Sequence, residues 1–546
     1  MRHRSSEVGS TTPNYPRIAA FLMFAMMFVI GACVFRDYGY ATDDGAQHFK
    51  SLVAAKRIAA AFGHVPDHLE KLPDLDRYDE KYYGTAIQMV PTFVEIAFGA
   101  DSSRAILLTR HFWTFLVYLA SLVCFYLLCL RLFPSRLYAF VGTLMLFLYP
   151  RFFAQSFYNI KDIVFCALLT MAIYACVVFL QEGRRTRHAL AAAFLTALAA
   201  NSRFAALALF AGTLFLMAVE DAGPSGTERK PLKPYLVYAL AFVASFIVLT
   251  PASWSNPLAF PFQYVTHFVG FDGWNGSMLF DGQLFRKDAM PRLYVPTWYV
   301  ISVPLAYLAF FIVGSFALVK DAASDRAPGG APRNLILCFL AALFFLPIAA
   351  TIVHRGLLYI EWRHLYFTFP LFVILALAGL RFAIERAPRP IPVIALAVIS
   401  LSLVSQALWI VRNHPYEYAY LNVVGRPLGD RFDRDYWGLS QKQLLTWLAD
   451  HAGQTPIKVA YVAGQPGSYL IFPEDMQKRF SIVDKDSADF VVTSFQRIAG
   501  NDYRIDGFEE IHSIQVDGYK IGAVYKAHAE TTAARSGAVP SGEPPR

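Results

Sequence analysis

The sequence predicts a polytopic α-helical membrane protein with a small α/β domain after its last membrane span. Two observations carry this prediction: 56% of the 546 residues are hydrophobic, and the apolar residues are gathered into long runs. A soluble chain with only 16% charged residues could not bury that much apolar surface in one core. The net charge of +8 does not indicate a nucleic-acid partner, because Lys and Arg lie mainly in short gaps between apolar runs.

A helix that crosses a bilayer needs about 20 apolar residues, and about eleven runs meet or approach this length. We interpret the first run as a retained helix, because it is long for a signal peptide and lacks a small-residue cleavage site. All six cysteines lie in apolar stretches without CxxC spacing, which indicates filler in helices rather than a metal or redox site. The expected spans are 18–35, 111–133, 136–150, 161–181, 187–201, 204–219, 234–250, 294–319, 334–353, 364–384 and 391–411.

The gaps between the spans predict the orientation, because cytoplasmic loops collect Lys and Arg. If the N-terminus is cytoplasmic, every cytoplasmic gap is basic, including the one that holds Arg184, Arg185 and Arg187. An odd number of spans then places the C-terminal domain outside, together with the long loops 36–103 and 251–293.

The fall in hydropathy after the last span and the composition of the C-terminal tail divide the chain into three parts. Residues 1–412 form the transmembrane domain, 413–527 an extracytoplasmic α/β domain, and 528–546 a tail that lacks large apolar residues and is expected to be disordered. In the α/β domain we expect a helix near 440–451 and four or fewer strands, among them segments beginning at 458, 489 and 519.

The first external loop contains one amphipathic segment and one moderately apolar segment. Residues 43–63 have apolar residues at helical spacing with Lys56 and Arg57 on the other side, which predicts a helix lying on the membrane surface. Residues 85–99 are too short and too interrupted to span, and we expect a second interfacial or re-entrant element there.

Asp43 and Asp44 follow the first span by only a few residues. An acidic pair close to the membrane surface is costly unless it is solvated or used. Two interpretations stand side by side: a solvated cap for the helix that follows, in which Thr42 or Asp43 is the N-cap residue, and a functional carboxylate site.

A second polar cluster lies between the third and fourth spans. Its charges at helix ends could serve only as interfacial anchors. The same set also suits an oxyanion and a hydroxyl-rich ligand. Its members are Arg151, Gln155, Tyr158, Asn159, Lys161 and Asp162.

Further cations lie on the external side, where the positive-inside bias does not explain them. They either pair with Glu361, Asp162 or lipid headgroups, or converge on a phosphate, which arginine forks bind well. They are Arg203, His354, Arg355, Arg363 and His364.

The signatures of soluble enzymes are missing: there is no P-loop, no HExxH, no GxSxG and no GxGxxG between a strand and a helix. We therefore do not expect nucleotide-driven chemistry, and we predict no cofactor and no metal, while leaving open whether a divalent metal joins Asp44.

Taken together, the chain resembles the GT-C superfamily of membrane glycosyltransferases over roughly residues 15–410. Within it the resemblance is to the branch of protein O-mannosyltransferases and the lipid A aminoarabinose transferase. The resemblance rests on Asp43–Asp44 after the first span, the interfacial helix behind it, the R-x(7)-N-x-K-D loop, and the late external HR…EWRH stretch. The Lys-Pro-Pro element of many bacterial members is replaced by EKYYGT, which leaves Lys81 as its counterpart.

The resemblance implies that Asp43 is the catalytic base, with Asp44 assisting, and that a lipid-phosphate sugar donor binds near the membrane surface. One base and a set of cations suffice for such chemistry, because the base takes the acceptor proton and the cations stabilise the departing phosphate. Direct attack would invert the anomeric centre. The expected phosphate ligands are Arg151, Lys161, Arg203, Arg355 and Arg363, with Lys81, Tyr158, Asn159, Asp162, His354 and His364 in support.

The leading hypothesis is therefore an inverting, extracytoplasmic glycosyltransferase in a bacterial inner membrane. It would use a polyprenyl-phosphate sugar donor and a hydroxyl acceptor on a protein, lipid or glycan. The alternative is a carrier or flippase for lipid-linked sugars, which would line a path through the bilayer with charged or broken helices. A structural assembly subunit is a third possibility.

Overall fold

A computed structural model describes residues 15–222, 231–269, 276–322, 331–354, 359–453 and 455–528. Two sequence predictions fall outside these ranges. They are the phosphate-binding role of Arg355 and, apart from residue 528, the disordered tail.

The first half of the chain is helical. It comprises α1 (Tyr15–Val34), α2 (Asp44–Ala61), α3 (Asp67–Glu70), α4 (Met89–Ala97), α5 (Ser103–Leu132), α6 (Arg136–Phe147), α7 (Pro150–Tyr158), α8 (Asp162–Gln181), α9 (Thr186–Ser202), α10 (Leu207–Asp221) and α11 (Lys233–Leu249).

The second half adds helices around a short hairpin. Its elements are α12 (Phe260–Val269), β1 (Ser277–Phe280), β2 (Gln283–Arg286), α13 (Tyr294–Ser302), α14 (Leu305–Ala322), α15 (Ala331–Val353), the 3-10 helix η7 (Arg363–Thr368), α16 (Phe369–Glu385) and α17 (Ile391–Asn413).

In the described part of the chain, seven helices are long and apolar enough to cross a membrane, or eight if α6 and α7, which meet at 66°, form one broken span. The expected count of eleven therefore stays a prediction. The expected single span 294–319 is wrong, because α13 and α14 are separate helices. Pro304 lies in the break, and a proline in a helix interior loses a hydrogen bond and clashes with the preceding turn.

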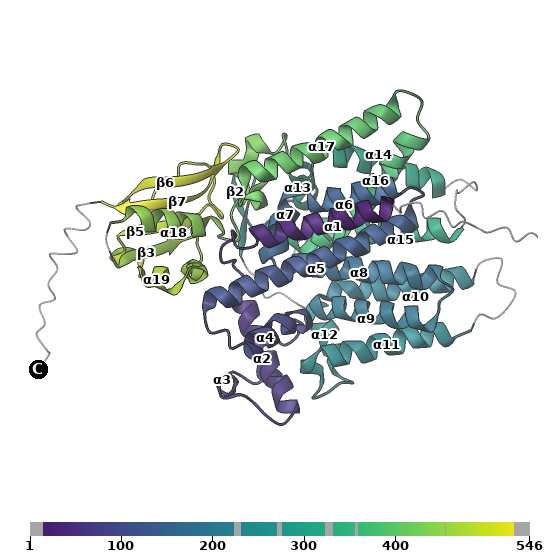
Figure 1. Cartoon of the computed structure of the whole chain (residues 1–546), viewed down its shortest axis with the longest axis horizontal. Helices are drawn as coiled ribbons and strands as arrows, with labels where there is room; N and C mark the ends of the chain where they lie inside the picture. Colours follow the sequence, from purple (N-terminus) through teal and green to yellow (C-terminus); the bar gives the residue numbers. More distant parts are fainter. Residues whose placement is uncertain are drawn as a thin grey trace, which may run out of the picture.

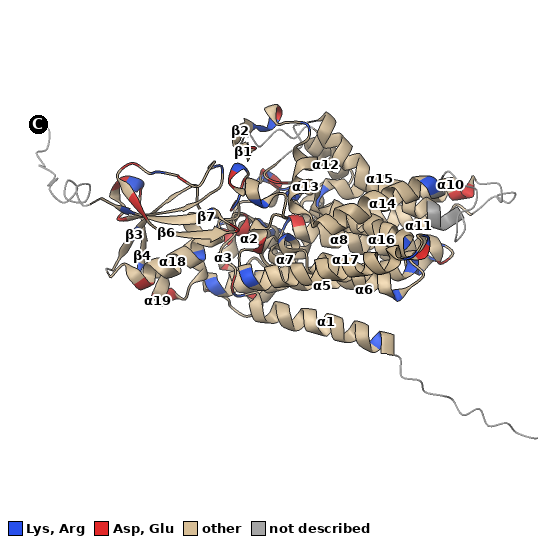
Figure 2. Ribbon diagram, turned by 90° about the horizontal axis from the view of Figure 1, so that it is seen from above, with Lys and Arg blue, Asp and Glu red and all other residues tan. Residues whose placement is uncertain are grey.

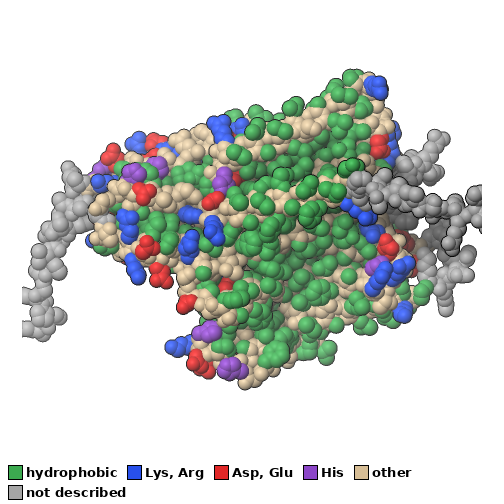
Figure 3. Space-filling view, in the orientation of Figure 1, with side chains coloured by type: hydrophobic (Ala, Val, Ile, Leu, Met, Phe, Trp, Pro, Cys, Tyr) green, Lys and Arg blue, Asp and Glu red, His purple; other side chains and the backbone are tan. Residues whose placement is uncertain are grey.

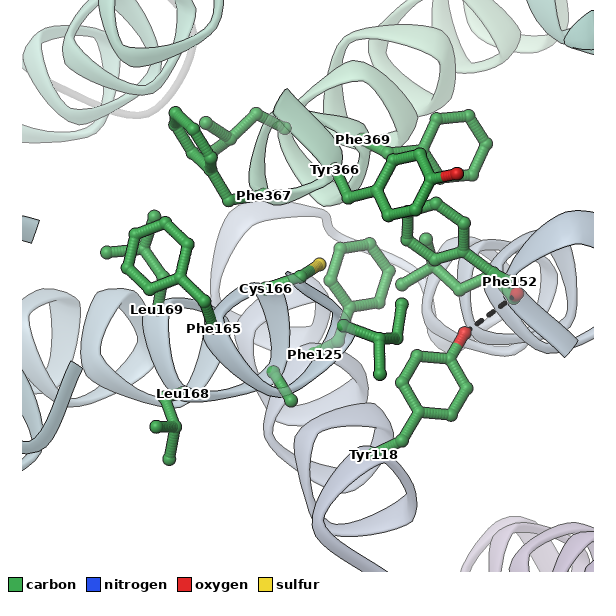
Figure 4. Close-up of a cluster of buried hydrophobic side chains, with 14 of the residues drawn as sticks. Tyr118, Phe125, Phe152, Phe165, Cys166, Leu168, Leu169, Tyr366, Phe367 and Phe369 are labelled. Carbon is green, nitrogen blue, oxygen red and sulfur yellow. Dashed lines mark hydrogen bonds between the residues drawn. The ribbon is translucent and has the colours of Figure 1, made fainter. Parts of the chain in front are cut away.

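The centre of the helical domain is packed by apolar side chains from α5, α7, α8 and η7 (Figure 4). The Tyr118 hydroxyl donates to the carbonyl oxygen of Leu146 at 2.9 Å, so even this polar group is satisfied inside the core. Helices α14 and α16 meet backbone to backbone: a Cβ on Gly314 would lie 1.8 Å from the Leu375 carbonyl oxygen. Such close contact through small residues is typical of membrane helices.

The C-terminal domain contains α18 (Ser440–His451), α19 (Glu474–Gln477) and a five-stranded sheet. Its strands are β3 (Ile457–Val462), β4 (Phe480–Ile482), β5 (Phe490–Ser494), β6 (Phe508–Val516) and β7 (Tyr519–Ala527), in the order β4-β3-β5-β7-β6. β3 runs parallel to β4 and β5, and β7 antiparallel to β5 and β6.

The expected helix 440–451 is confirmed, and the expectation of four or fewer strands is wrong. The strands that the sequence pattern did not indicate are the two edges of the sheet. β4 has only three residues, and β6 is partly exposed along much of its length, so neither presents a continuous apolar run.

The C-terminal domain, α2, α3 and α4 all lie at one end of the long helices (Figure 1). The charged side chains gather at the two ends of the helical domain and leave its middle nearly uncharged (Figure 2). A broad hydrophobic surface covers the same middle region (Figure 3). The arrangement is that of an integral membrane protein with polar structure at one end.

Candidate active site

Asp43 lies immediately before α2, at the N-cap position of the helix. The carboxylate caps no backbone N–H of α2 and instead accepts a hydrogen bond on Oδ2 from Arg363 Nη1 at 3.2 Å. Its side chain is 20% exposed, and among the described residues no donor bonds to Oδ1. One carboxylate oxygen is therefore held in place while the other stays available.

The charge of Asp43 is set by the cations around it. Burial alone would raise the pKa of this carboxyl group, but attraction to Arg363 and Lys161 outweighs burial and lowers the pKa from its ordinary value. Asp43 is therefore ionised at neutral pH, as a group that accepts a proton must be.

Asp44 faces a different part of the protein. Its side chain is 1% exposed, and its Oδ2 accepts from the Ala41 backbone N–H at 2.8 Å and lies 3.6 Å from Nε2 of His111. No contact in the described structure joins Asp44 to the cations that surround Asp43. The two neighbouring carboxylates thus have separate environments.

Arg363 begins η7 and connects two carboxylates. Its Nη1 lies 3.2 Å from Asp43 and 3.5 Å from Oδ2 of Asp162. The guanidinium is stacked over Tyr436, 4.5 Å from the ring centroid, and lies 5.4 Å from that of Trp437. These aromatic faces hold a buried cation without neutralising it.

The N-terminus of α8 places Lys161 and Asp162 beside Arg363. Asn159 Oδ1 accepts from the Asp162 backbone N–H at 2.7 Å and from that of Lys161 at 3.3 Å, which closes the turn into the helix. Arg203, at the C-terminal end of α9, donates to Oδ1 of Asp162. Asn159 and Asp162 therefore fix the cations rather than serve as exposed ligands.

The ammonium group of Lys161 makes no ion pair in the described structure, and it lies 5.1 Å from the centroid of the Tyr83 ring. We call Asp43, Lys161, Asp162, Arg203 and Arg363 the site cluster. It holds three cations and two carboxylates, so it has an excess of positive charge that suits an anionic ligand. His364 lies against it, with its ring 3.9 Å from that of Tyr359.

Three residues expected at the site make other contacts. Arg151 Nη1 donates to Glu361 Oε2 at 2.8 Å, and its Nε donates to the Tyr420 carbonyl oxygen at 2.8 Å. It is 1% exposed and therefore forms an internal ion pair. Tyr158 is buried between Tyr38 and Trp437. Lys81 donates to the Asp76 carbonyl oxygen at 2.7 Å.

His354 is exposed just after α15, and none of the contacts described joins it to the site cluster. The expected convergence of Asp43 with Lys161, Arg203 and Arg363 is thus observed, whereas that of Arg151, Lys81 and Tyr158 is not. Their expected roles as ligands or supporting groups rested on their position in the chain, which does not fix where a side chain points.

Sequence reasoning missed the aromatic residues Tyr436 and Trp437 and the cation Lys50. Tyr436 and Trp437 lie in the segment DRDYWGLS, and Thr42, next to Asp43, donates to the Tyr436 carbonyl oxygen at 2.9 Å. Lys50 lies two turns after Asp43 on α2, a spacing that puts both on one helix face. That spacing was the one signal that could have found Lys50.

No group of three or more His, Cys, Asp or Glu side chains in the described ranges could hold a metal ion. The site cluster has two carboxylates, each already engaged by arginine.

Residues 93–254 match the family model of dolichyl-phosphate-mannose-protein mannosyltransferases. The matched range runs from within α4 past the end of α11, so it includes Lys161, Asp162 and Arg203 but neither Asp43 nor Arg363. No curated protein matches the sequence of this chain.

Solved structures with a similar fold include the oligosaccharyltransferase of Archaeoglobus fulgidus in its apo form, with a TM-score of 0.50 and 11% identity over 88% of this chain and 70% of that chain. ArnT from Cupriavidus metallidurans bound to undecaprenyl phosphate has a TM-score of 0.47 and 12% identity, over 93% of this chain and 98% of that chain. The Archaeoglobus fulgidus enzyme AglB in complex with an inhibitory peptide and a dolichol-phosphate has a TM-score of 0.43 and 11% identity, over 87% of this chain and 70% of that chain.

Proposed function

We propose that this chain, an integral membrane protein with the fold of the GT-C membrane glycosyltransferases, transfers a sugar from a polyprenyl-phosphate donor to a hydroxyl acceptor. The family model over residues 93–254 supports the donor class, because its description names a sugar linked to a polyprenyl phosphate.

The observation that carries the proposal is the meeting of Asp43 with three cations from separate elements. Asp43 precedes α2, Lys161 and Arg203 border α8 and α9, and Arg363 begins η7. An ionised carboxylate with a free oxygen and cations that can hold a phosphate are the two parts that glycosyl transfer from a phosphate requires.

In the proposed reaction, Oδ1 of Asp43 takes the proton of the acceptor hydroxyl as the acceptor oxygen attacks the anomeric carbon. The bond between that carbon and the phosphate oxygen breaks, and its electron pair leaves with the phosphate. The donor phosphodiester carries one negative charge and the departing monoester gains another, so Lys161, Arg203 and Arg363 bind the transition state more tightly than the donor. A single displacement inverts the anomeric centre.

A carrier for lipid-linked sugars is the competing function, and the charge distribution argues against it. Helices α8 and α11 carry their only charged residues, Asp162 and Lys233, in the first position. At the far end of α8, Arg184 is paired with Glu220 and Asp221. A carrier would need accessible charge on both sides of the bilayer, whereas the described cluster lies at one end.

The test is transfer of a labelled sugar from a polyprenyl-phosphate donor by membranes that carry Asp43→Asn. We expect the rate to fall by about 10²–10⁴-fold, the usual contribution of a general base, while the amount of inserted protein is unchanged. Asp37→Asn is the matched control, because Asp37 lies in the same loop but pairs with His414. An Asp43→Asn variant that transfers sugar at the full rate would rule out the proposed base.

A further inference from the structure

A buried lysine and a half-exposed glutamate form an unequal ion pair beside the site cluster. The side chain of Lys50 is 2% exposed, and its Nζ lies 2.6 Å from Oε2 of Glu80, whose side chain is 49% exposed. The cation is fixed inside the protein on α2. The carboxylate reaches it from the outside, from the loop between α3 and α4.

The same lysine shares an aromatic ring with Lys161. The ammonium groups of Lys50 and Lys161 lie 4.6 Å and 5.1 Å from the centroid of the Tyr83 ring. Two like charges near one ring repel each other unless an anion lies with them. In the described structure Glu80 supplies that anion for Lys50 in a direct ion pair. Lys161 is attracted to the Asp43 carboxylate but forms no direct ion pair in the described residues.

We propose that the Glu80 carboxylate occupies the place of a phosphate oxygen, and that the phosphate of the polyprenyl donor displaces Glu80 and binds Lys50 together with Lys161. This inference rests on the proposed function and adds to it a phosphate ligand, Lys50, and an internal competitor, Glu80. The ligand is the phosphate of a lipid ester.

The exchange is favourable in charge and in solvation. A carboxylate and a phosphodiester each carry one negative charge and offer oxygens to the same ammonium donor. Glu80 is already half in water, so it regains hydration when it leaves, whereas Lys50 is buried and needs an anionic partner at all times. The departing phosphate monoester, with its extra charge, competes with Glu80 better than the donor does.

The inference predicts opposite effects for the two members of the pair. Binding of a polyprenyl monophosphate to the detergent-solubilised full chain is measured for Glu80→Gln and for Lys50→Met. We expect Glu80→Gln to bind about three- to tenfold more tightly, because the competing carboxylate is removed. We expect Lys50→Met to bind about tenfold more weakly, because a hydrogen bond to a charged group is lost. Lys50→Arg keeps the charge and is expected to restore most of the binding.

Asp79→Asn is the matched control, since Asp79 is the exposed neighbour of Glu80 and should leave the affinity unchanged. Inorganic phosphate is the second probe. We expect it to compete only at much higher concentration than the lipid, whereas equal competition would contradict a site for a lipid ester. Thermal unfolding of each variant shows that the chain stays folded.

The inference is overturned if Glu80→Gln binds the lipid no better than the unchanged chain, or if Lys50→Met binds it equally well. It fails separately from the proposed function. Opposite shifts in binding by a chain that transfers no sugar would refute only the transferase, and sugar transfer with unshifted binding would refute only the role of Lys50 and Glu80.

Discussion

Lys161 is the cation of the site cluster whose charge depends most on pH near neutrality. Burial lowers the pKa of its ammonium group, the Asp43 carboxylate opposes that effect, and the result is a pKa of about 8. Because the pKa is lowered, the ammonium group is charged below about pH 8 and loses its proton above it. Donor binding should therefore weaken on the alkaline side.

We expect kcat/KM for the donor to fall about tenfold per pH unit above about pH 8, since this ratio reports groups of the free enzyme. Lys161→Arg should remove that alkaline limb, because arginine stays charged. The measurement is kcat/KM between about pH 6 and 10 for both proteins. A limb that persists in Lys161→Arg would assign the titration to another group.

Asp43 sets the acid side of the same profile. The cations hold the pKa of Asp43 below its ordinary value, so the carboxylate should stay ionised throughout the neutral range. We therefore expect the enzyme to lose activity through protonation of Asp43 only in strong acid. A low pKa weakens a base, yet in the proposed reaction the same positive charges that lower the pKa would also bind the phosphate. The proposed mechanism thus combines a weaker base with tighter binding of the transition state.

At the scale of elements, the site is completed by the segment between α17 and α18. That segment places Tyr436 under Arg363, and it is tied to the loop before α2 by the bond from Thr42 to the Tyr436 carbonyl oxygen. A residue far along the chain therefore holds the cation that orients Asp43. The C-terminal domain is part of the site and not only an appendage.

Tyr436→Ala should lower kcat/KM about thirtyfold, because a desolvated cation–π contact contributes about 2 kcal/mol. Tyr436→Phe keeps the ring face and should retain most of the activity, with the loss in Tyr436→Ala appearing mainly in KM for the donor. Steady-state kinetics of both variants and of Tyr469→Ala, a tyrosine of the same domain with no contact to Arg363, check this. Equal losses in Tyr436→Phe and Tyr436→Ala would show that the ring face does not matter.

The spans could be predicted from the apolar composition of long runs, and several site residues from the position of their charges along the chain. Spans such as α5, α8 and α17 are long apolar runs, and Asp43, Lys161 and Arg363 stood out as charges on the external side. The partner of each charge could not be predicted. Arg151 and Arg363 were both expected on the external side, yet only the structure shows that Arg151 pairs with Glu361 while Arg363 contacts both Asp43 and Asp162.

At the scale of the whole molecule, the described polar structure is arranged around one end of the helices. Ser103, the first residue of α5, donates to the Leu470 carbonyl oxygen of the C-terminal domain. The 30 residues of α5 then extend about 45 Å to the opposite end, where Arg131 pairs with Glu182. The site cluster and the C-terminal domain must therefore face the same side of the membrane.

The proposed orientation places that side outside. A cysteine introduced at Ser487, which is exposed in the C-terminal domain, should react with a membrane-impermeant maleimide on intact cells. One introduced at Ser135, exposed between α5 and α6, should react only after permeabilisation. The unsubstituted chain is the background control, and the reverse pattern would place the site cluster in the cytoplasm.

The most direct test of the central claim is an experimental structure of the full chain bound to a polyprenyl monophosphate. We expect the phosphate within hydrogen-bonding distance of Lys161 Nζ and of the Arg203 or Arg363 guanidinium, with the Asp43 carboxylate facing it across the position of the sugar. A phosphate bound at the opposite end, near Arg131 and Arg184, with Asp43 still closed against Arg363, would contradict the account.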